Sequence, residues 1–302
     1  MLENIKSAKT RVMVANTMML LAAVIWGGNF VAMKSSLGSL PLNWFNFLRH
    51  ALATLLLCWV LFVKKLDWAV LWRGVVIGVL HYATTQAQNY GLLFTTAGKC
   101  ALITGSYAVI VPLMNWVLTR KRPPARILVA AVVMVVGVGL LSIQDDLMLS
   151  YGDMFVLLCA VLCSVNIIAT DRYVKKCDPL MLAFVTIACC TLCSLVGGLA
   201  LEPFPAELGS DILFPLIYSG ALGVMGGFVL TNVAQVYARP EYASLFMSTE
   251  SAFGCLFGVT LLGETLTGRM GVGCVLVLIA LFLSQVQFKR FGHRALKRGE
   301  TS

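Results

Sequence analysis

Arg49, His81 and Glu250 are ionisable side chains inside long apolar stretches of the sequence. A buried carboxylate such as that of Glu250 can bind a cationic group, carry a proton or pair with a base of the protein. The guanidinium of Arg49 can clamp a carboxylate, or it can be a structural cation that pairs with backbone carbonyls or with Glu250. His81 is either a hydrogen-bonded structural residue or a proton relay.

Amide side chains and aromatic rings occur in the same apolar stretches. Buried amides need hydrogen-bond partners, so the polar cluster at 84–89 is expected to face a cavity or another helix. Aromatic rings usually serve packing, but beside an acid some of them can form a cation–π wall. The residues that we expect to contact a small-molecule substrate are Glu250, Trp26, Asn29, Tyr82, Tyr107, Arg49, His81, Gln86, Asn166 and Phe253.

The composition predicts a membrane protein. Of the 302 residues, 59% are hydrophobic and 12% are charged, about half the charge of a soluble domain, and the mean hydropathy is +0.86. Apolar runs long enough to span a bilayer recur along the chain. The net charge of +9 does not indicate a nucleic-acid-binding protein, because the basic residues form short clusters between the apolar runs.

Motifs of enzymes and metal sites are missing from the sequence. It contains no H-E-x-x-H, no G-x-S-x-G and no phosphate-binding loop. The C-x-x-C from Cys190 to Cys193 lies in an apolar stretch without a second pair, where free cysteine packs as a small hydrophobe. We therefore expect no catalytic residue, no metal ion and no cofactor. A membrane-embedded enzyme or sensor is the alternative from another functional class.

Ten transmembrane helices are predicted, with breaks at charged, proline and glycine clusters. Their spans are 12–35, 42–63, 69–93, 97–119, 125–143, 152–173, 178–200, 212–238, 242–262 and 270–288. If the N-terminus is cytoplasmic, the inside segments hold 19 lysine and arginine residues and the outside segments hold three. The positive-inside rule then places both termini in the cytoplasm and the loop around Asp145–Asp153 outside.

The two halves of the chain are predicted to be inverted repeats. An offset of 143 aligns Tyr107 with Glu250, and an offset of 137 aligns Asn29 with Asn166. Because five helices per half is an odd number, two similar halves must insert in opposite orientations, with a binding site near the midplane between them. The predicted fold class is an all-α integral membrane protein of ten transmembrane helices in two inverted five-helix repeats, in which helices four and nine meet near the centre.

Glycine, proline and one further acid predict details of helix packing. The G-x-x-x-G spacings at 74–78 and 254–258 allow close approach of helices. Pro112 and Pro215 are expected to kink their helices. Glu264, at the outer end of helix nine, is expected to cap a helix or to pair locally rather than to bind a ligand.

Several short motifs resemble those of one transporter family. They are Ile25-Trp26-Gly27-Gly28-Asn29-Phe30, Phe47-Leu48-Arg49, the segment 97–107 followed by Val111-Pro112-Leu113, and Leu261-Leu262-Gly263-Glu264. In order and spacing, over roughly residues 12–288, they resemble the drug/metabolite transporter superfamily with two EamA-type domains. The resemblance implies a first repeat at 1–145 with helices one to five, a second repeat at 146–302 with helices six to ten, and a central cavity. Members of this family often export amino acids or other metabolites.

The chain departs from the family pattern in three places. Arg120-Lys121-Arg122 stands where the first half often has G-E, Ser251 replaces the proline that usually follows Glu250, and Cys163 replaces a tryptophan of the sixth helix. These departures concern the substrate and leave the expected fold unchanged.

The expected function is that of a secondary transporter that exports a small amino-acid-like or cationic metabolite by alternating access. The alternative within transport is a proton-coupled exporter of lipophilic toxic cations. A zwitterionic substrate would need both Arg49 and Glu250, whereas a cation would need only the acid. The expected partners are the small-molecule substrate, the lipid bilayer of the cell inner (plasma) membrane and, in the alternative, a proton. No nucleic-acid partner is expected, and the chain is expected to act as a monomer or a homodimer.

Overall fold

The computed structural model describes residues 8–37, 39–142, 150–205, 209–237 and 240–285, and in them every named element is a helix. The elements are α1 (Ala8–Ser36), α2 (Leu42–Leu57), α3 (Val60–Val63), α4 (Trp68–Leu93), α5 (Ala97–Thr104), α6 (Tyr107–Thr119), α7 (Ala125–Ser142), α8 (Tyr151–Val174), α9 (Pro179–Leu201), η1 (Ser210–Ile212), α10 (Leu213–Ile217), η2 (Tyr218–Gly226), α11 (Gly227–Gln235), α12 (Pro240–Met247), α13 (Glu250–Leu262) and α14 (Gly268–Gln285). This all-helical architecture confirms the predicted fold class.

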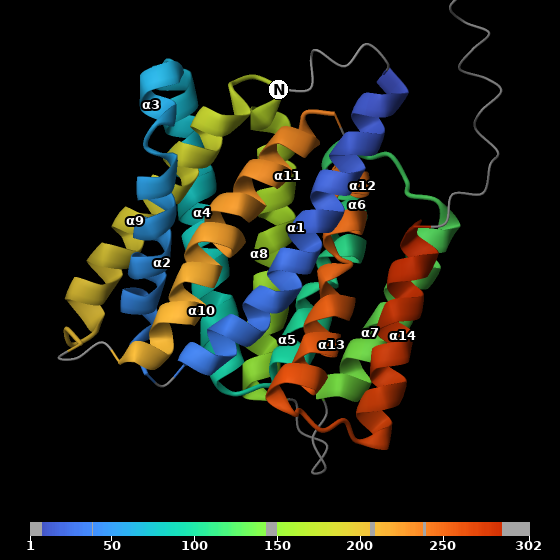
Figure 1. The fold of residues 1–302 in the computed structure, drawn as a ribbon. Helices are drawn as coiled ribbons and strands as arrows, with labels where there is room; N and C mark the ends of the chain where they lie inside the picture. The colour runs from blue at the N-terminus through green and yellow to red at the C-terminus, as the bar shows by residue number, and fades with distance from the viewer. Residues whose placement is uncertain (1–7, 38, 143–149, 206–208, 238–239, 286–302) are drawn as a thin grey trace, which may run out of the picture.

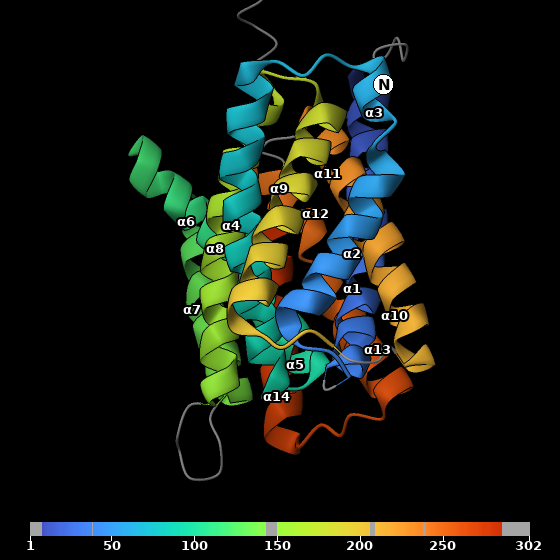
Figure 2. The same cartoon turned by 90° about the vertical axis from the view of Figure 1, so that its left-hand side faces the viewer.

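The described elements group into ten helical segments, each within a few residues of a predicted span. By length and composition six of the described helices can cross a membrane, and α7, α13 and α14 are shorter apolar helices. Successive segments run in opposite directions, so that α1 begins and α14 ends at the same end of the bundle (Figure 1, Figure 2). The predicted loop around Asp145–Asp153 falls mostly outside the described residues, since the description resumes at residue 150.

The bundle presents apolar side chains on its outside and polar ones within. Val135, Leu199 and Phe282 are 72%, 69% and 66% exposed. A large apolar surface of this kind favours aggregation in water but suits a lipid environment. Asn46 and Thr186, in contrast, are fully buried between helices.

A break divides the fourth and the ninth helical segments at equivalent places. α5 ends at Thr104 and α6 begins at Tyr107, while α12 ends at Met247 and α13 begins at Glu250. Both pairs of residues differ by 143, the offset by which the sequence aligns the two halves. The fourth segment is still one spanning stretch over Ala97–Thr119, as predicted, and the tight turn lies within it; in the ninth segment Glu250 stands directly after the equivalent turn, at the start of α13.

Tighter turns of the backbone produce both breaks. The N–H of Ser106 donates to the carbonyl of Ile103 at 3.1 Å, and the N–H of Ser251 donates to the carbonyl of Ser248 at 3.1 Å. Such i→i+3 bonds replace the i→i+4 bonds of an α-helix and shorten the turn. Hydropathy does not report on this change of bonding, so a continuous apolar run could not predict it.

The two broken segments also end in the same backbone conformation. Arg120 closes α6 with φ of 56°, and Gly263 closes α13 with φ of 65°, again at an offset of 143. Glycine adopts this left-handed conformation freely, whereas an L-residue such as Arg120 does so at a cost of about 1 kcal/mol. The departure from the glycine of the family pattern therefore leaves the chain path intact.

Two glycines pack the first parts of the halves together in equivalent ways. A Cβ on Gly78 of α4 would stand 2.8 Å from the carbonyl oxygen of Thr186 in α9. A Cβ on Gly220 of η2 would stand 2.8 Å from the carbonyl oxygen of Arg49 in α2. Positions 186 and 49 differ by 137, the offset predicted for the first parts of the halves.

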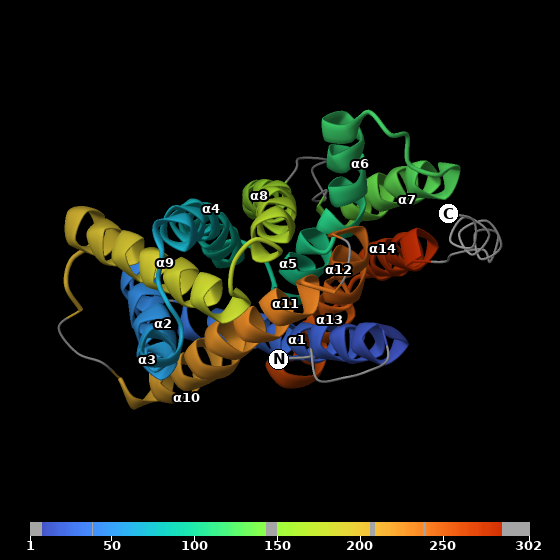
Figure 3. The ribbon, with the colours of Figure 1, turned by 90° about the horizontal axis from the view of Figure 1, so that it is seen from above.

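Equivalent segments of the two halves pack against one another: α7 with α14, α2 with α9, and the fourth with the ninth segment through α5 and α13 (Figure 3). α1 packs on α11 and α13, and its counterpart α8 packs on α4, α5 and α6. α1 and α8 run in opposite directions (Figure 1), as inverted repeats require. The exchange of partners between the halves places the centre of the bundle between α1, α4, α8 and α11.

Carboxylates from distant parts of the chain cap two helices at the end of the bundle where α1 ends (Figure 1). Glu264 accepts hydrogen bonds from the N–H groups of Ala97 at 2.6 Å and Gly98 at 2.9 Å, which begin α5. Glu202, just after α9, accepts from the N–H of Asn43 at 2.9 Å in the first turn of α2. An anion there satisfies free N–H groups and complements the helix dipole. Glu264 thus caps a helix as expected, but the helix belongs to the other half.

Candidate functional site

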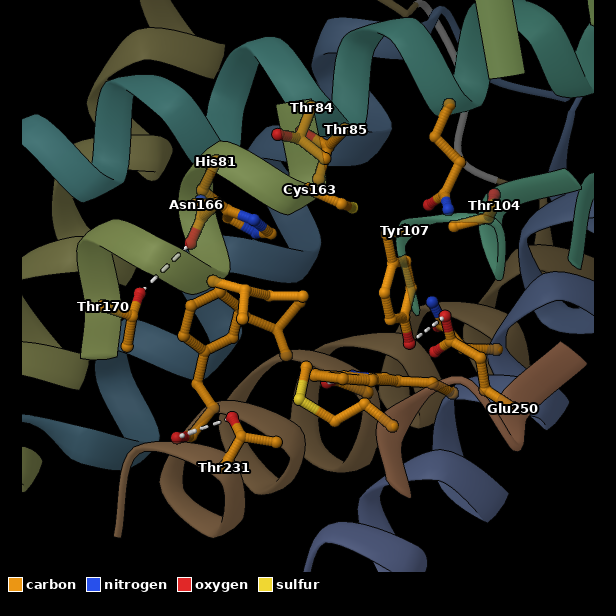
Figure 4. A pocket seen from close by; sticks show the side chains of 18 of the residues that line it. His81, Thr84, Thr85, Thr104, Tyr107, Cys163, Asn166, Thr170, Thr231 and Glu250 are labelled. Atoms are coloured by element: carbon orange, nitrogen blue, oxygen red, sulfur yellow. Dashed lines mark hydrogen bonds between the residues drawn. The ribbon is translucent and has the colours of Figure 1, made fainter. Parts of the chain in front are cut away.

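A central cavity of about 130 Å³ lies between the two halves (Figure 4). Its lining residues are Trp26, Asn29, Phe30, Arg49, His81, Thr84, Thr85, Gln88, Thr104, Tyr107, Cys163, Asn166, Ile167, Thr170, Gly223, Val224, Phe228, Thr231, Asn232, Gln235, Met247 and Glu250. Seven of the ten residues predicted to contact a substrate are among them, namely Trp26, Asn29, Arg49, His81, Tyr107, Asn166 and Glu250.

Glu250 and Tyr107 meet at one wall of the cavity, where Tyr107 Oη donates a hydrogen bond to Glu250 Oε1 at 3.0 Å (Figure 4). This contact confirms that the fourth and ninth segments bring the two aligned residues to the same depth. Glu250 begins α13, so its carboxylate lies at the positive end of that helix. Among the described residues Glu250 takes part in no ion pair.

Arg49 lies on the α2 wall and is 2% exposed. Its Nη1 donates to Met33 Sδ at 3.1 Å, and the guanidinium carbon stands 5.7 Å from the centre of the Phe45 ring. Neither the expected pairing with Glu250 nor a bond to a backbone carbonyl is formed by the described residues, and Arg49 Nε has no partner among them. The structural role expected for Arg49 is corrected in this respect, since a thioether is only a weak acceptor.

His81 lines the cavity from α4 and contacts a second histidine behind it. His81 Nε2 lies 3.2 Å from Nε2 of His50 on α2, and His50 Nδ1 lies 2.7 Å from the carbonyl oxygen of Asn46. Cys190 of α9 joins them, so that one ligand atom from each of the three side chains lies within 4.8 Å of the others. His81 is thus hydrogen-bonded, which is one of the two roles expected for it.

Two aligned amides face the cavity from opposite halves, Asn29 from α1 and Asn166 from α8. Thr170 Oγ1 donates to Asn166 Oδ1 at 3.2 Å (Figure 4), and Asn29 Nδ2 donates to Met33 Sδ at 3.1 Å. Asn29 Oδ1 and Gln235 Oε1 are buried without a hydrogen-bond partner among the described residues. Because buried acceptors are rarely left unpaired, these two oxygens are candidates to accept from N–H groups of a ligand.

Trp26 contributes its ring to the cavity rather than its N–H group. Trp26 Nε1 donates to the carbonyl oxygen of Gly223 at 2.8 Å. That carbonyl belongs to η2, a stretch of wide π-helical turns in which carbonyl groups lose their α-helical partners. Gly227 also lies against the Trp26 ring, because a Cβ at that position would collide with Trp26 Nε1.

The other three predicted substrate residues do not line the cavity. Tyr82 Oη donates to Asn43 Oδ1 at 2.9 Å, and Gln86 Nε2 donates to the same oxygen. Their polar groups therefore join α4 to α2 instead of facing a ligand. Phe253 packs its Cβ against Gly27 of α1 and stacks its ring on Phe257. Glu250 and Phe253 both lie in α13, three residues apart, yet only Glu250 lines the cavity, because the side chain of Phe253 packs on α1.

Several lining residues are absent from the set predicted by the sequence. They are Phe30, Thr84, Thr85, Gln88, Thr104, Cys163, Ile167, Thr170, Gly223, Val224, Phe228, Thr231, Asn232, Gln235 and Met247. For the threonines and amides the available signal is a polar residue in an apolar run. For Phe228 and Val224 there is none, because an apolar residue of a spanning helix faces lipid, core or cavity with the same composition.

The cavity extends toward one end of the bundle. Thr170 lies one turn before the end of α8, and Gln235 is the last residue of α11. Both helices finish at the end where α1 begins (Figure 1). At the opposite end Lys99 Nζ pairs with Asp153 Oδ2 at 2.8 Å, and Thr95 Oγ1 donates to Asp153 Oδ1 at 2.6 Å. The helices are thus joined on that side by buried polar contacts.

Known proteins resemble this chain along most of its length. The model of the EamA-like transporter family matches it twice, over residues 13–143 and 150–285. An uncharacterized transporter of Archaeoglobus fulgidus is 28% identical over 264 residues, which cover 87% of this chain and 83% of that protein. The uncharacterized transporter YoaV of Bacillus subtilis is 20% identical, covering 88% of this chain and 95% of that protein.

A solved crystal structure shares the fold with a TM-score of 0.68 and 17% sequence identity, covering 90% of this chain and 96% of that one. The double family match fills both halves, in agreement with the repeated breaks and caps of the structure. The resemblance to the EamA-type transporters is thereby confirmed, and with it the prediction that the chain is a multi-pass membrane transporter. The chain belongs to the EamA-like transporter family.

Proposed function

We propose that this protein is a secondary transporter that exports a small amino-acid-like or cationic metabolite by alternating access. The observation that carries the proposal is that Arg49 and Glu250 line the same cavity without being paired to each other. Opposite charges on buried side chains of one cavity match a ligand that carries both an ammonium and a carboxylate. Glu250 would receive the ammonium and Arg49 the carboxylate.

The size and the remaining wall of the cavity support a small ligand. A volume of about 130 Å³ is similar to that of cavities that hold one benzene ring, about 150 Å³. The rings of Trp26 and Phe228 supply apolar surface, while Asn29 and Gln235 offer unpaired oxygens for the N–H groups of an amine. The match to the EamA-like transporter family favours transport over an enzymatic activity.

The direction in which the cavity extends supports an inward-facing state. Its wall reaches the helix ends beside the start of α1, which the basic residues predict to be cytoplasmic, in the inner membrane with both termini inside. The bonds of Lys99 and Asp153 would close the outer side. Loss of these bonds and closure of α8 on α11 would then expose the same residues to the outside.

Uptake into proteoliposomes tests the proposal. The purified chain is assayed with zwitterionic amino acids, simple amines and simple carboxylates, and Arg49→Gln is compared with wild type. We expect zwitterions and amines to be transported, and Arg49→Gln to reduce zwitterion uptake at least tenfold while amine uptake persists. Arg73→Gln, which changes a cation outside the cavity beside Trp72, is the matched control and should leave uptake unchanged. Transport of carboxylates alone, or of none of the three classes, would refute the proposal.

A proton-coupled exporter of lipophilic cations is the second candidate. The rings of Trp26, Phe30 and Phe228 on the cavity wall, with Glu250 as its acid, favour it. In that case Arg49→Gln leaves transport of lipophilic quaternary amines unaffected, and an imposed pH gradient drives their accumulation. Uptake of zwitterions without dependence on the pH gradient would exclude this candidate.

A further inference from the structure

Three helices bring two imidazoles and one thiol together beside the central cavity. His50 lies on α2, His81 on α4 and Cys190 on α9, with one ligand atom of each within 4.8 Å of the others. We call these three residues the His–His–Cys cluster. His50 and Cys190 are fully buried. Histidine nitrogen and cysteine sulfur are the donors that soft and borderline metal ions prefer.

The hydrogen bond of His50 sets which of its nitrogens can bind an ion. His50 Nδ1 lies 2.7 Å from the carbonyl oxygen of Asn46, which can only accept, so Nδ1 carries the proton. In the neutral ring Nε2 then presents its lone pair toward His81. A backbone carbonyl behind the opposite nitrogen is the usual support of a metal-binding histidine.

The distance between the rings fits a shared ion. The two Nε2 atoms are 3.2 Å apart. Two nitrogens that bind one metal ion at about 2.0–2.1 Å stand about 3.3–3.6 Å apart. An ion between His50 and His81 therefore needs only a small displacement of the rings, with Cys190 as the third ligand.

Charge selects the kind of ion. Arg49 is the charged group that acts on all three members of the cluster. A buried site with one thiolate and two neutral imidazoles is neutral with a monovalent ion but carries a net positive charge with a divalent one. A net charge buried beside a guanidinium is unfavourable. Soft thiolate ligands favour Cu(I) among the metals of proteins.

We propose that the His–His–Cys cluster is a three-coordinate site for a monovalent soft metal ion, Cu(I), on the wall of the central cavity. Cu(I) replaces the thiol proton of Cys190, and that proton leaves through the cavity, which His81 lines. The copper stays in the same oxidation state, so no oxidant or reductant takes part. Because α2 and α4 belong to one half and α9 to the other, the bound ion ties the two halves together.

Competition with a chromophoric Cu(I) chelator tests the site on the full-length chain in detergent under reducing conditions. We expect wild type to bind one more Cu(I) per chain than His50→Gln, His81→Gln or Cys190→Ser, whose affinity at this site falls at least a hundredfold. Cys193→Ser, one turn further along α9 and outside the cluster, is the matched control and keeps the ion. This comparison separates the site from other cysteines that bind copper, which are present in every variant.

Two further measurements decide between outcomes. X-ray absorption of the copper should show two nitrogen ligands and one sulfur ligand in wild type, and the melting temperature should rise with Cu(I) only where the cluster is intact. Equal copper stoichiometry in wild type and in the well-folded His50→Gln protein would overturn the proposal. Zn(II) bound by these residues as tightly as Cu(I) would overturn the choice of a monovalent ion. Neither result depends on whether transport is observed.

Discussion

Replacing Glu250 by Gln removes the negative charge of the cavity and little else. The glutamine has the same shape, and its side-chain oxygen can still accept the hydrogen bond that Tyr107 Oη now donates at 3.0 Å. Because Glu250 forms no ion pair with another described residue, no partner cation is left unpaired by the change. We therefore expect the Glu250→Gln protein to fold and to insert as wild type does.

The size of the effect follows from the bond that a substrate ammonium would lose. A hydrogen bond to a charged group contributes about 1.5–3 kcal/mol. With about 1.4 kcal/mol for each factor of ten, affinity for amines and zwitterions should fall roughly 12- to 150-fold. Burial of Glu250 at 5% exposure limits screening by water, so the effect should not be smaller than this range.

Concentration-dependent uptake into proteoliposomes measures the change in affinity for an amine and for a zwitterion. Glu264→Gln is the matched control, because it removes an acid that caps α5 and does not line the cavity. In that variant the helix cap is weakened, so the free energy of unfolding should fall by about 0.5–2 kcal/mol and the melting temperature should be lower. Its substrate selectivity should be unchanged. Unchanged affinity and unchanged pH dependence in Glu250→Gln would show that the acid is structural and would refute the assignment.

Three more outcomes are expected. Gly78→Ala and Gly220→Ala should each lower the free energy of unfolding by about 1–3 kcal/mol, because the new Cβ meets a backbone carbonyl oxygen at 2.8 Å. Gly139→Ala is the control and should leave stability unchanged, because no atom lies within 4 Å of its Cβ. Equal melting temperatures of the three variants would contradict the close helix contacts of Gly78 and Gly220. Partial burial raises the pKa of Asp178, but Lys64 and two backbone N–H groups outweigh it and lower the pKa below its usual range. Its contribution to stability should therefore be present above about pH 4 and be lost as the pH falls through the lowered pKa, a loss absent from Asp178→Asn in melting curves at acid pH. Phe204 is exposed in the connection after α9, which the predicted topology places outside. The thiol of a Phe204→Cys variant should therefore react with membrane-impermeant thiol reagents added outside, and labelling only from the cytoplasm would show that the predicted topology is inverted.

The sequence predicts the helices well because a spanning helix needs a long apolar run with charged ends. The alignment of Tyr107 with Glu250 holds because two repeats keep their helix lengths even where few residues match. The breaks inside the fourth and ninth segments could not be predicted, since the small residues within them (Gly105, Ser106, Ser248 and Thr249) occur in α-helices and in tighter turns alike. The cap of α5 by Glu264 is equally invisible, because the partners are 167 residues apart.

Side-chain direction limits what the sequence can say about the site. Tyr82 and His81 are neighbours in one polar stretch of α4, yet His81 lines the cavity and Tyr82 bonds to Asn43 of α2. A polar residue within a membrane needs a partner, and neither composition nor spacing tells whether that partner is another helix or a ligand. The role of His50 could not be predicted either, because its neighbours His81 and Cys190 are brought to it only when α2, α4 and α9 pack together.

The chemistry of the cavity arises where the two repeats differ. Asn29 and Asn166 are aligned and identical, and both line the cavity. Arg49, in contrast, aligns with Thr186 of the second half, and Glu250 aligns with Tyr107 of the first half. Each half therefore supplies one charged residue at a position where the other half has a neutral one. The fold needs only the shared features, such as the helix breaks and the close glycine contacts. Charge selectivity can therefore change at positions where the repeats differ, and exchanging Tyr107 with Glu250, which are joined by one hydrogen bond, should alter the substrate while the architecture is kept.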